Sequence, residues 1–442
     1  MRSHVNGEVP SATTAPPVTL TATQEGMWIA ERLRPGRSGY HDAVTLHLSG
    51  PLDAGRLRAA FLDCHQRHDA LRLRIHDDGA APRQSFDAPP PAWHEHDLRG
   101  LAGARQTADC RRRFALDCTA PFDLVTGPLW RARLLRLGDR EHRLTIVLHH
   151  LMTDGWSHGV FLRTLISRYA TRLHGAGAPA SPASSFRSWV RRRVEAENAP
   201  GVAERAREAA AELSGVPRRI ALPGLTGATG LRGAVRALDL EPGDLADFNA
   251  ACAAAGVSRF MAMTSLLALQ ISRLSGAVEL MVAAPVADRL TPEAAQVLGC
   301  TINTVPIRFG AAASPKDAVL AGRVSVVRAL RLLDVPYRDV IRAAEPSTGM
   351  SSADPLTNVS CEEFNSPRGT WKVGPLTVTA LPRGEFQTRH DLTLSVPHSA
   401  AEAPEMIYPV RRWQPDAIAG ITGGLADLVR AFGRPARRPP AV

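Results

Sequence analysis

The sequence contains no apolar run of about 18 residues, the length that a membrane-spanning helix requires. The opening residues 1–18 are polar and lack the apolar core of a signal peptide, which argues against export. We therefore expect a soluble cytoplasmic protein with no membrane partner. Residues 1–18 should form a disordered leader.

Cysteine is also scarce, and its spacing excludes two classes of small domain. No Cys-x-x-Cys pair is present, and no histidines stand at metal-ligand spacing from a cysteine, which argues against both a disulfide framework and a zinc site. We expect no bound metal. All six thiols should be reduced, namely Cys64, Cys110, Cys118, Cys252, Cys300 and Cys361.

Length and composition are those of a globular protein with two domains. The chain has 442 residues, of which 44% are hydrophobic and 22% charged, enough for two domains of about 200 residues. The net charge of +10 should attract anionic partners. No aromatic-interleaved basic motif or helix-turn-helix pattern is present, so we expect no nucleic acid. An acidic carrier protein fits the charge equally well, and charge alone does not choose a partner.

A linker composition divides the chain. Gly, Ala, Pro and Ser dominate residues 175–185, so we place a linker at 176–185, between a first lobe at 19–175 and a second lobe at 186–435. A disordered tail should occupy residues 436–442. Apolar periodicity predicts strands at 42–48, 130–137 and 278–289, and helices at 53–65, 157–173, 258–274 and 415–432.

Chemistry is expected where a β-branched run ends in His149 and His150 and an Asp-Gly pair follows at 154–155. Because side chains alternate along a strand, one histidine should face a cavity and the other the packing behind it. Neutral imidazole can accept a proton near pH 7, and His150, at the strand end, is the better candidate base. The ordinary alternative is a hydrogen-bonded structural histidine.

The pattern His149-His150-x-x-x-Asp154-Gly155 resembles the HHxxxDG motif of the condensation domains of nonribosomal peptide synthetases. These domains belong to the chloramphenicol acetyltransferase-like superfamily of acyltransferases. Trp156 and Ser157 extend the match.

Other segments carry the resemblance from about residue 20 to 432. They comprise a capping-box helix start with Thr21, Gln24 and Trp28, the corner Arg67–Arg72 with Asp69 in place of the usual Glu, the stretch Leu298–Arg308 with Asn303-Thr304, and the partial motif Asp334–Tyr337.

The resemblance implies an α/β (α+β) fold. Two chloramphenicol acetyltransferase-like lobes should form a V-shaped pseudo-dimer with an active-site tunnel between them. In this family the motif aspartate pairs with an arginine, and Arg289 is the candidate partner of Asp154. Arg67, His68 and Arg72 are expected to be scaffold residues that satisfy backbone carbonyl groups.

Site roles follow from the same resemblance. His150 is the base or the group that positions the nucleophile, His149 is counted with the catalytic set as support for the turn, and Gly155 can offer a backbone N–H to a substrate oxygen. Five further residues are substrate-binding candidates by position, each equally consistent with a core or turn role: Trp156, Ser157, Asn303, Thr304 and Ser360.

The function so implied is that of a free-standing condensation enzyme of antibiotic biosynthesis. It would transfer an acyl or aminoacyl group from a carrier protein's 4′-phosphopantetheine thioester to an amine or alcohol acceptor. No cofactor would stay bound, and the enzyme would act as a monomer with an acyl or peptidyl carrier protein as partner. Two alternatives stay open, an acyl-CoA-dependent O- or N-acyltransferase of the same fold and a catalytically silent carrier-docking or recruitment module.

Overall fold

The computed structural model describes residues 15–33, 39–79, 81–175, 184–344, 356–365, 368–382, 384 and 386–434. Most of the predicted leader and linker and all of the predicted tail at 436–442 lie outside these residues. The leader was expected to reach Val18, whereas Val18–Thr19 form strand β1, whose backbone pairs with β4 (Arg83–Phe86).

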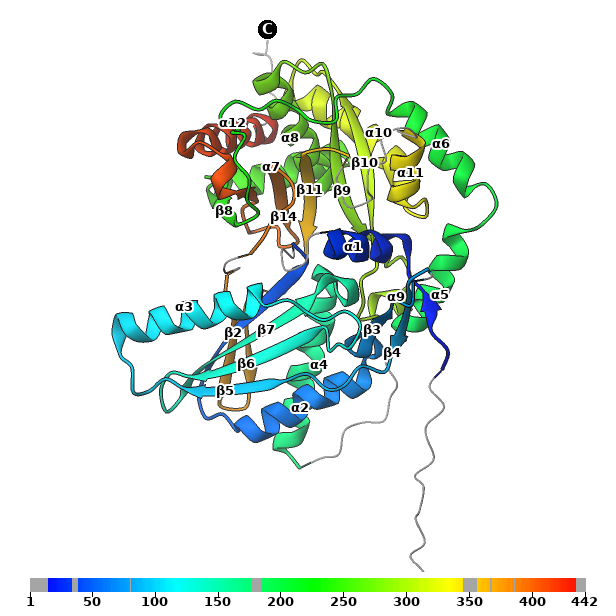
Figure 1. The fold of residues 1–442 in the computed structure, drawn as a ribbon. Coiled ribbons are helices and arrows are strands. Elements are labelled where there is room, and N and C mark those ends of the chain that lie inside the picture. The colour runs from blue at the N-terminus through cyan, green and yellow to red at the C-terminus, as the bar shows by residue number, and fades with distance from the viewer. Residues whose placement is uncertain are drawn as a thin grey trace, which may run out of the picture.

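The first sheet lies in the lower half of Figure 1 and has six strands among the described residues. In order across the sheet, they are β12 (Thr370–Val373), β13 (Leu376–Ala380), β2 (His41–Ser49), β7 (Glu141–His149), β6 (Trp130–Arg136) and β5 (Trp93–Asp97). Only the pair of β5 and β6 is parallel. The two central strands, β2 and β7, run antiparallel over their whole length, which brings the N-terminal end of β2 beside the histidines.

Helices cover both faces of this sheet because its strands alternate their buried side chains. Leu134 of β6 belongs to the first core with helices α2 (Ala54–Arg67) and α4 (Gly155–Leu173). Its neighbour Leu135 packs against Cys110 of α3 (Gly103–Thr119) on the other face. Asp53 caps α2 by accepting a hydrogen bond from the Arg56 N–H at 2.9 Å.

The second sheet, in the upper half of Figure 1, has six described strands too. They follow the order β10 (Ile302–Gly310), β9 (Glu279–Ala287), β11 (Val359–Phe364), β14 (Leu392–Pro397), β15 (Glu405–Pro409) and β8 (Gly233–Ala237). Strand β11 pairs in parallel with both β9 and β14. The second core packs this sheet against α7 (Pro242–Ala255), α8 (Arg259–Ser275), α10 (Pro315–Leu330) and α12 (Pro415–Gly433).

Smaller elements complete the fold. A three-stranded sheet joins β1, β4 and β3 (Leu73–His76). The remaining elements are α1 (Ala22–Leu33), α5 (Phe186–Glu197), α6 (Val202–Glu212), α9 (Pro292–Ala295), α11 (Tyr337–Ala344) and the 3-10 turns Asp69–Arg72, His150–Met152 and Val410–Arg412. Helix α1 lies between the two halves (Figure 1). The capping box predicted at its start is present, because the Thr21 N–H donates to Gln24 and the Gln24 N–H donates to the Thr21 hydroxyl.

Segments of the predicted second lobe also build the first lobe. The first core also contains Phe186 and Trp189 of α5, and Val297 and Leu298, which precede β10. These side chains are apolar and pack with the other apolar side chains of that core. Strand β13 pairs with β2, so that the β12–β13 hairpin extends the first sheet. The lobe boundaries stay a prediction, but the chain crosses between the lobes more often than one linker implies.

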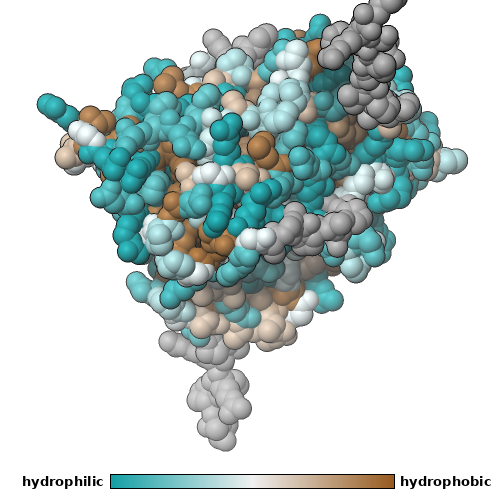
Figure 2. All heavy atoms as spheres, turned by 90° about the horizontal axis from the view of Figure 1, so that it is seen from below, coloured by the Kyte–Doolittle hydropathy of each residue, from teal (hydrophilic) through white to brown (hydrophobic). Residues whose placement is uncertain are grey.

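Polar side chains gather at the surface and large apolar side chains lie inside, as expected for a protein with two hydrophobic cores. Figure 2 shows a mainly hydrophilic face with dispersed hydrophobic areas, while the largest apolar side chains are buried inside. Among the described residues, no single helix is long and apolar enough to cross a membrane. Helices α7 and α8 meet the length and composition test only as a pair, bent by 103°.

Candidate active site

The two histidines stand at the break between strand β7 and helix α4, and their side chains point to different surroundings. His149 is the last residue of β7 and is 1% exposed. His150 begins the 3-10 turn that follows, and 23% of its side chain is exposed in a pocket. The structure thus places one histidine in the cavity and the other in the packing behind it.

His149 lies in an aromatic and polar cluster inside the first lobe. Its Nδ1 accepts a hydrogen bond from the Leu151 N–H at 3.1 Å, which supports the turn. Its Nε2 lies 3.6 Å from Glu31 Oε1, and its ring meets His41 edge-on. Burial lowers its pKa, which favours the neutral ring. His149 does not line the pocket, so the geometry supports its role in the turn and not contact with substrate.

His150 lies beside the carboxylate of Asp42, and both residues line the pocket. Its Nε2 lies 3.6 Å from Asp42 Oδ2, and its Nδ1 lies 4.0 Å from the Cys300 sulfur. Burial lowers the pKa of His150, but the charge of Asp42 and the contact with Cys300 have a larger, opposite effect. The net result is a pKa raised to about 10. The ring therefore has a stronger affinity for a proton than an ordinary histidine.

Asp154 lines the pocket, but its carboxylate is held by a buried network of hydrogen bonds and one ion pair. It caps α4, its carboxylate is 1% exposed, and both its oxygens lie 2.9 Å from Arg289 Nη2. It also accepts hydrogen bonds from the N–H and hydroxyl groups of Ser157 and Thr301, at 2.7–3.0 Å. Burial raises the pKa of Asp154, but Arg289 and these donors lower it below the usual value overall. The predicted ion pair with Arg289 is present.

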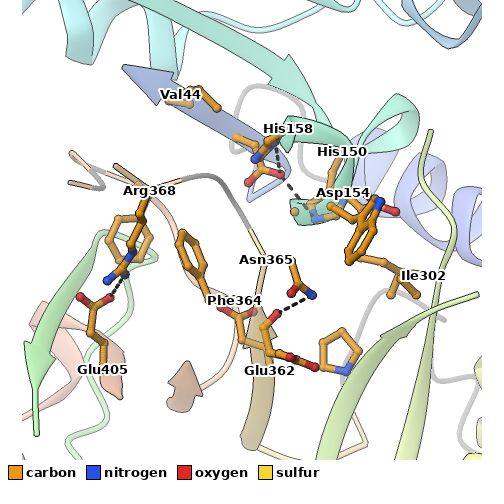
Figure 3. Close-up of a pocket in the computed structure, with 18 of the residues that line it drawn as sticks. Val44, His150, Asp154, His158, Ile302, Glu362, Phe364, Asn365, Arg368 and Glu405 are labelled. Carbon is orange, nitrogen blue, oxygen red and sulfur yellow. Dashed lines mark hydrogen bonds and ion pairs between the residues drawn. The ribbon is translucent and has the colours of Figure 1, made fainter. Parts of the chain in front are cut away.

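The pocket has a volume of about 790 Å³ and is lined by both lobes. Figure 3 shows His150, His158 and Asp154 on the wall of the first lobe, opposite Glu362 and Asn365 of the second. Arg368 also lines the pocket and pairs with Glu405 at 2.9 Å. Apolar lining comes from Trp156, Phe260, Met261, Val286, Ile302, Val326, Leu330 and Phe364. A pocket of this size accommodates a small organic substrate.

The predicted site residues divide into two groups. Gly155 and Trp156 line the pocket, and the Trp156 indole N–H donates to the Ala295 carbonyl at 2.8 Å. The pocket lining does not include Ser157, Asn303, Thr304 or Ser360. Ser157, which is buried, instead lies 2.8 Å from the Gly299 carbonyl and supports the Asp154 network.

Asn303, Thr304 and Ser360 do not line the pocket, and strand phase explains this for Asn303. Asn303 donates to the carbonyl groups of Leu333 and Val335 at 2.9 and 2.7 Å, and Ser360 lies 2.7 Å from Thr393 Oγ1 inside the second sheet. Ile302 of β10 lines the pocket, and alternation turns the next residue, Asn303, away from it. Position in a motif did not determine these orientations.

Sequence reasoning missed Asp42, His158 and Cys300. Asp42 lies on β2 opposite Leu148 of β7, and His158 lies on α4 one turn after Asp154. Asp42 Oδ2 is 3.7 Å from His158 Nε2, so one carboxylate oxygen approaches two histidines. The register of β2 against β7 creates this cluster, and a pattern along the sequence alone did not predict it.

The expected scaffold residues at 67–72 have structural contacts. Arg72 donates to the carbonyl groups of His65 and Gln66 at 2.6 and 2.7 Å, and His68 lies 3.1 Å from the Thr164 hydroxyl. Asp69 accepts hydrogen bonds from the backbone N–H groups of Phe186 and Arg187 at the start of α5. This corner joins α2 to α5 and does not line the pocket.

Comparison with known sequences gives one family. A family model described as Condensation domain matches residues 15–403. The chain is 32% identical over 370 residues to phosphinothricin tripeptide synthetase PhsC of Streptomyces viridochromogenes, an alignment that covers 78% of this chain and 32% of that protein. The chain spans about a third or less of the length of curated relatives such as this one.

Solved structures share the fold. The X-domain from teicoplanin biosynthesis superposes with a TM-score of 0.82 at 22% identity, over 96% of each chain. The first condensation domain of the calcium-dependent antibiotic synthetase, in complex with a substrate analogue, superposes with a TM-score of 0.79 at 19% identity, over 96% of this chain and 98% of that one. The expected α/β fold with two acetyltransferase-like lobes is confirmed.

Proposed function

Because the chain belongs to the condensation-domain family of nonribosomal peptide synthetases, we propose that it transfers an acyl or aminoacyl group from a carrier protein's phosphopantetheine thioester to an amine or alcohol acceptor. The observation that carries the proposal is the position of His150. Its imidazole faces a pocket that both lobes line, next to Asp42 and outside the buried network of Asp154.

The residues present suit acyl transfer without an acyl-enzyme intermediate. The donor arrives already activated as a thioester, so the enzyme has to orient the acceptor and take up its proton. In this proposal His150 accepts that proton as the new C–N or C–O bond forms and the C–S bond breaks. The proton then neutralises the departing thiolate. Cys300, the thiol near His150, does not line the pocket, which agrees with direct transfer.

Charge that develops on the carbonyl oxygen requires a donor. Gly155 is the first residue of α4 and lines the pocket, and the N-terminal end of a helix carries a partial positive charge. We therefore assign the Gly155 backbone N–H to this oxygen. Asp154 and Arg289 act through structure, because their ion pair fixes the turn that presents His150 and Gly155.

Product formation with a loaded carrier tests the proposal. We expect wild-type protein to acylate an amine or alcohol acceptor, and His150→Ala to lower turnover roughly 100- to 10,000-fold, the usual contribution of a general base. Mass spectrometry of the products measures this loss. His94→Ala, at an exposed position of β5, is the matched control and should keep full activity. Equal rates for wild type and His150→Ala would remove His150 from the mechanism.

The donor and the alternatives can be separated in the same assay. The same acyl group is offered on a carrier protein and on coenzyme A, with one acceptor. A higher rate with the carrier supports a condensation enzyme, and a higher rate with coenzyme A supports an acyl-CoA-dependent acyltransferase of this fold. Tight carrier binding without turnover across a panel of acceptors would support the docking module instead.

A further inference from the structure

Cys300 contacts the imidazole of His150 at the ring nitrogen that is turned away from Asp42. Its Sγ lies 4.0 Å from His150 Nδ1, whereas His150 Nε2 lies 3.6 Å from Asp42 Oδ2, a contact that a dashed line marks in Figure 3. Cys300 is 1% exposed, belongs to the first core and does not line the pocket. It therefore meets the ring and not a substrate.

The backbone on both sides of Cys300 is hydrogen-bonded to the start of α4, close to His150. The Gly299 N–H donates to the Ser157 hydroxyl oxygen at 3.0 Å, and the Thr301 N–H donates to Asp154 Oδ2 at 3.0 Å. Asp154 caps α4, and Ser157 lies in the first turn of this helix. The backbone of Cys300 therefore keeps its place beside the turn as long as these hydrogen bonds are present.

The contact with sulfur favours one orientation of the His150 ring. The backbone N–H of His150 donates to the Tyr40 carbonyl at 2.8 Å, which fixes the main chain at this point. Half a turn of the ring about its Cβ–Cγ bond would put Cδ2 in the place of Nδ1, and a C–H group is a weaker donor than N–H. Sulfur is a weak acceptor, but a hydrogen bond strengthens when its donor is ionised. The contact at Nδ1 therefore opposes this rotation most when the ring is protonated.

Other ionisable groups act on the charge of the same ring. Burial lowers the pKa of His150, whereas Asp42 on β2, Cys300, and Asp154 at the start of α4 raise it. Burial also lowers the pKa of His149 on β7, which favours the neutral form of this neighbour. Of these groups, Cys300 is the one in contact with Nδ1.

We propose that Cys300 is a positioning residue, whose sulfur accepts a hydrogen bond from the Nδ1–H group of His150 and thereby keeps Nε2 directed into the pocket. This inference rests on the proposed function, because it assigns a role at the same site. The Nδ1 proton stays on the ring during acyl transfer, and Nε2 alone takes up and releases a proton. Because the segment of Cys300 continues into β10, the second lobe helps to orient a base that the first lobe carries.

Titration of His150 by nuclear magnetic resonance tests the contact without turnover. The full chain carries isotope-labelled histidine, and the spectrum of His150→Ala identifies the signal among the 15 histidines. Cys300→Ala should move the titration of His150 to lower pH, because a hydrogen bond that favours the protonated ring is lost. Loss of packing alone would let water approach the ring and would move the titration the other way.

Turnover measures the positioning role. The kcat is divided by the fraction of His150 that is neutral at the assay pH, taken from the titration, so that the change in pKa does not hide the effect of orientation. This corrected kcat should fall roughly 10- to 100-fold in Cys300→Ala, because a small displacement of a catalytic group costs up to about this factor. The KM of the acceptor should change less, since Cys300 does not line the pocket.

Two further variants separate the hydrogen bond from core packing. Cys300→Ser keeps a hydroxyl that accepts a hydrogen bond, and it should restore part of the titration shift and part of the corrected kcat. Cys252→Ala is the matched control, because it removes a thiol that is 3% exposed in α7, within the second core. It should leave the titration of His150 and the corrected kcat unchanged.

Each outcome supports or overturns the proposal. If Cys300→Ala titrates as wild type does, or if its corrected kcat equals that of wild type, the positioning role is overturned. Equal losses in Cys300→Ala and Cys300→Ser, or the same losses in Cys252→Ala, would also overturn it, because packing would then be the cause.

The proposed function is judged separately, by His150→Ala. If this variant transfers the acyl group as fast as wild type, the proposed function loses its base. A lowered pKa of His150 in Cys300→Ala would still support the hydrogen bond between the two residues.

Discussion

At the scale of single residues, the Asp154 carboxylate shows how the site separates structure from chemistry. Two backbone N–H groups, two hydroxyls and Arg289 surround it, and none of these hydrogen bonds or ion pairs involves His150, although the charge of Asp154 helps to raise the pKa of His150. An aspartate in a catalytic motif can therefore be essential for activity without taking part in proton transfer.

Replacing Asp154 with alanine should lower the free energy of unfolding by about 3–5 kcal/mol, because Arg289 would remain buried without its partner. Chemical denaturation measures the change. Asp139→Ala, at a side chain that is 82% exposed, is the control and should change stability by less than about 0.5 kcal/mol. A stable Asp154→Ala protein without activity would show that the carboxylate does act in the chemistry.

The charge of Asp42 should be visible in the pH dependence of the reaction. Burial lowers the pKa of His150, but Asp42, Cys300 and Asp154 outweigh this effect and raise it to about 10, and a base must be neutral to accept a proton. We therefore expect kcat/KM to rise with pH through the neutral range. Asp42→Asn should move this limb to lower pH, because the charge that favours the imidazolium is gone. Coinciding profiles for wild type and Asp42→Asn would contradict the assignment.

The same shift contributes to stability with a defined sign. The pKa of His150 is higher in the folded chain than the ordinary value of 6.5, so the protonated ring stabilises the fold. This contribution is fully present below pH 6.5 and is lost as the pH rises towards about 10. Unfolding of His150→Ala should lack this part of the pH dependence.

Sequence alone identified some of these residues and missed others for a physical reason. His150 and the partner of Asp154 follow from the motif and from the need of a buried carboxylate for a cation. Asp42 reaches His150 only through the pairing of two strands, and His158 through the angle at which α4 leaves the turn. Both depend on tertiary geometry that a local pattern does not contain.

At the scale of elements, the apolar periodicity of the sequence predicted where helices and strands form better than it predicted which way their side chains point. The helix expected at 53–65 is α2 at 54–67, and the strand expected at 42–48 is β2 at 41–49. Asn303 does not line the pocket, although its neighbour Ile302 does, because a strand places neighbours on opposite faces. A motif position therefore does not say which residue meets the pocket.

Close packing of elements makes Gly299 sensitive to substitution. A Cβ at this position would lie 2.0 Å from Cδ2 of the buried Phe186 ring, next to the segment in which Thr301 binds Asp154. Gly299→Ala should lower the free energy of unfolding by about 1–3 kcal/mol, and it should also reduce turnover. Thermal unfolding and the transfer assay measure the two effects.

Gly310→Ala provides the comparison for that experiment. Gly310 ends β10, and no neighbouring atom lies within 4 Å of an added Cβ. Its stability should stay within about 0.5 kcal/mol of wild type. Equal stabilities of the two variants would show that Phe186 relaxes without cost.

At the scale of the whole molecule, the two lobes share residues and do not stand side by side as separate units. Helix α5 and the segment before β10 fill the first core, and the β12–β13 hairpin extends its sheet. Contacts between α1 and the second lobe add to this, with an ion pair from Glu25 to Arg338 and a hydrogen bond from Thr23 to the Ile302 carbonyl at 2.9 Å.

A fragment of residues 15–175 should therefore fail to fold by itself. It lacks Phe186, Trp189 and Leu298 of the first core and the hairpin beside β2, so apolar surface and strand edges would be exposed. We expect no cooperative thermal transition, in contrast to the full chain. A sharp transition with native-like near-ultraviolet dichroism in the fragment would show that the first lobe is autonomous.

The pairing of β13 with β2, two segments far apart in the sequence, has consequences for protein synthesis and for the design of chimeras. Ribosomes deliver the N-terminal part first, yet the free edge of β2 stays open to pairing with other chains until Leu376–Ala380 has been synthesised. Nascent protein would need shielding during this interval. Chimeras that exchange one lobe between relatives should carry residues 370–380 with the N-terminal half to which they are hydrogen-bonded.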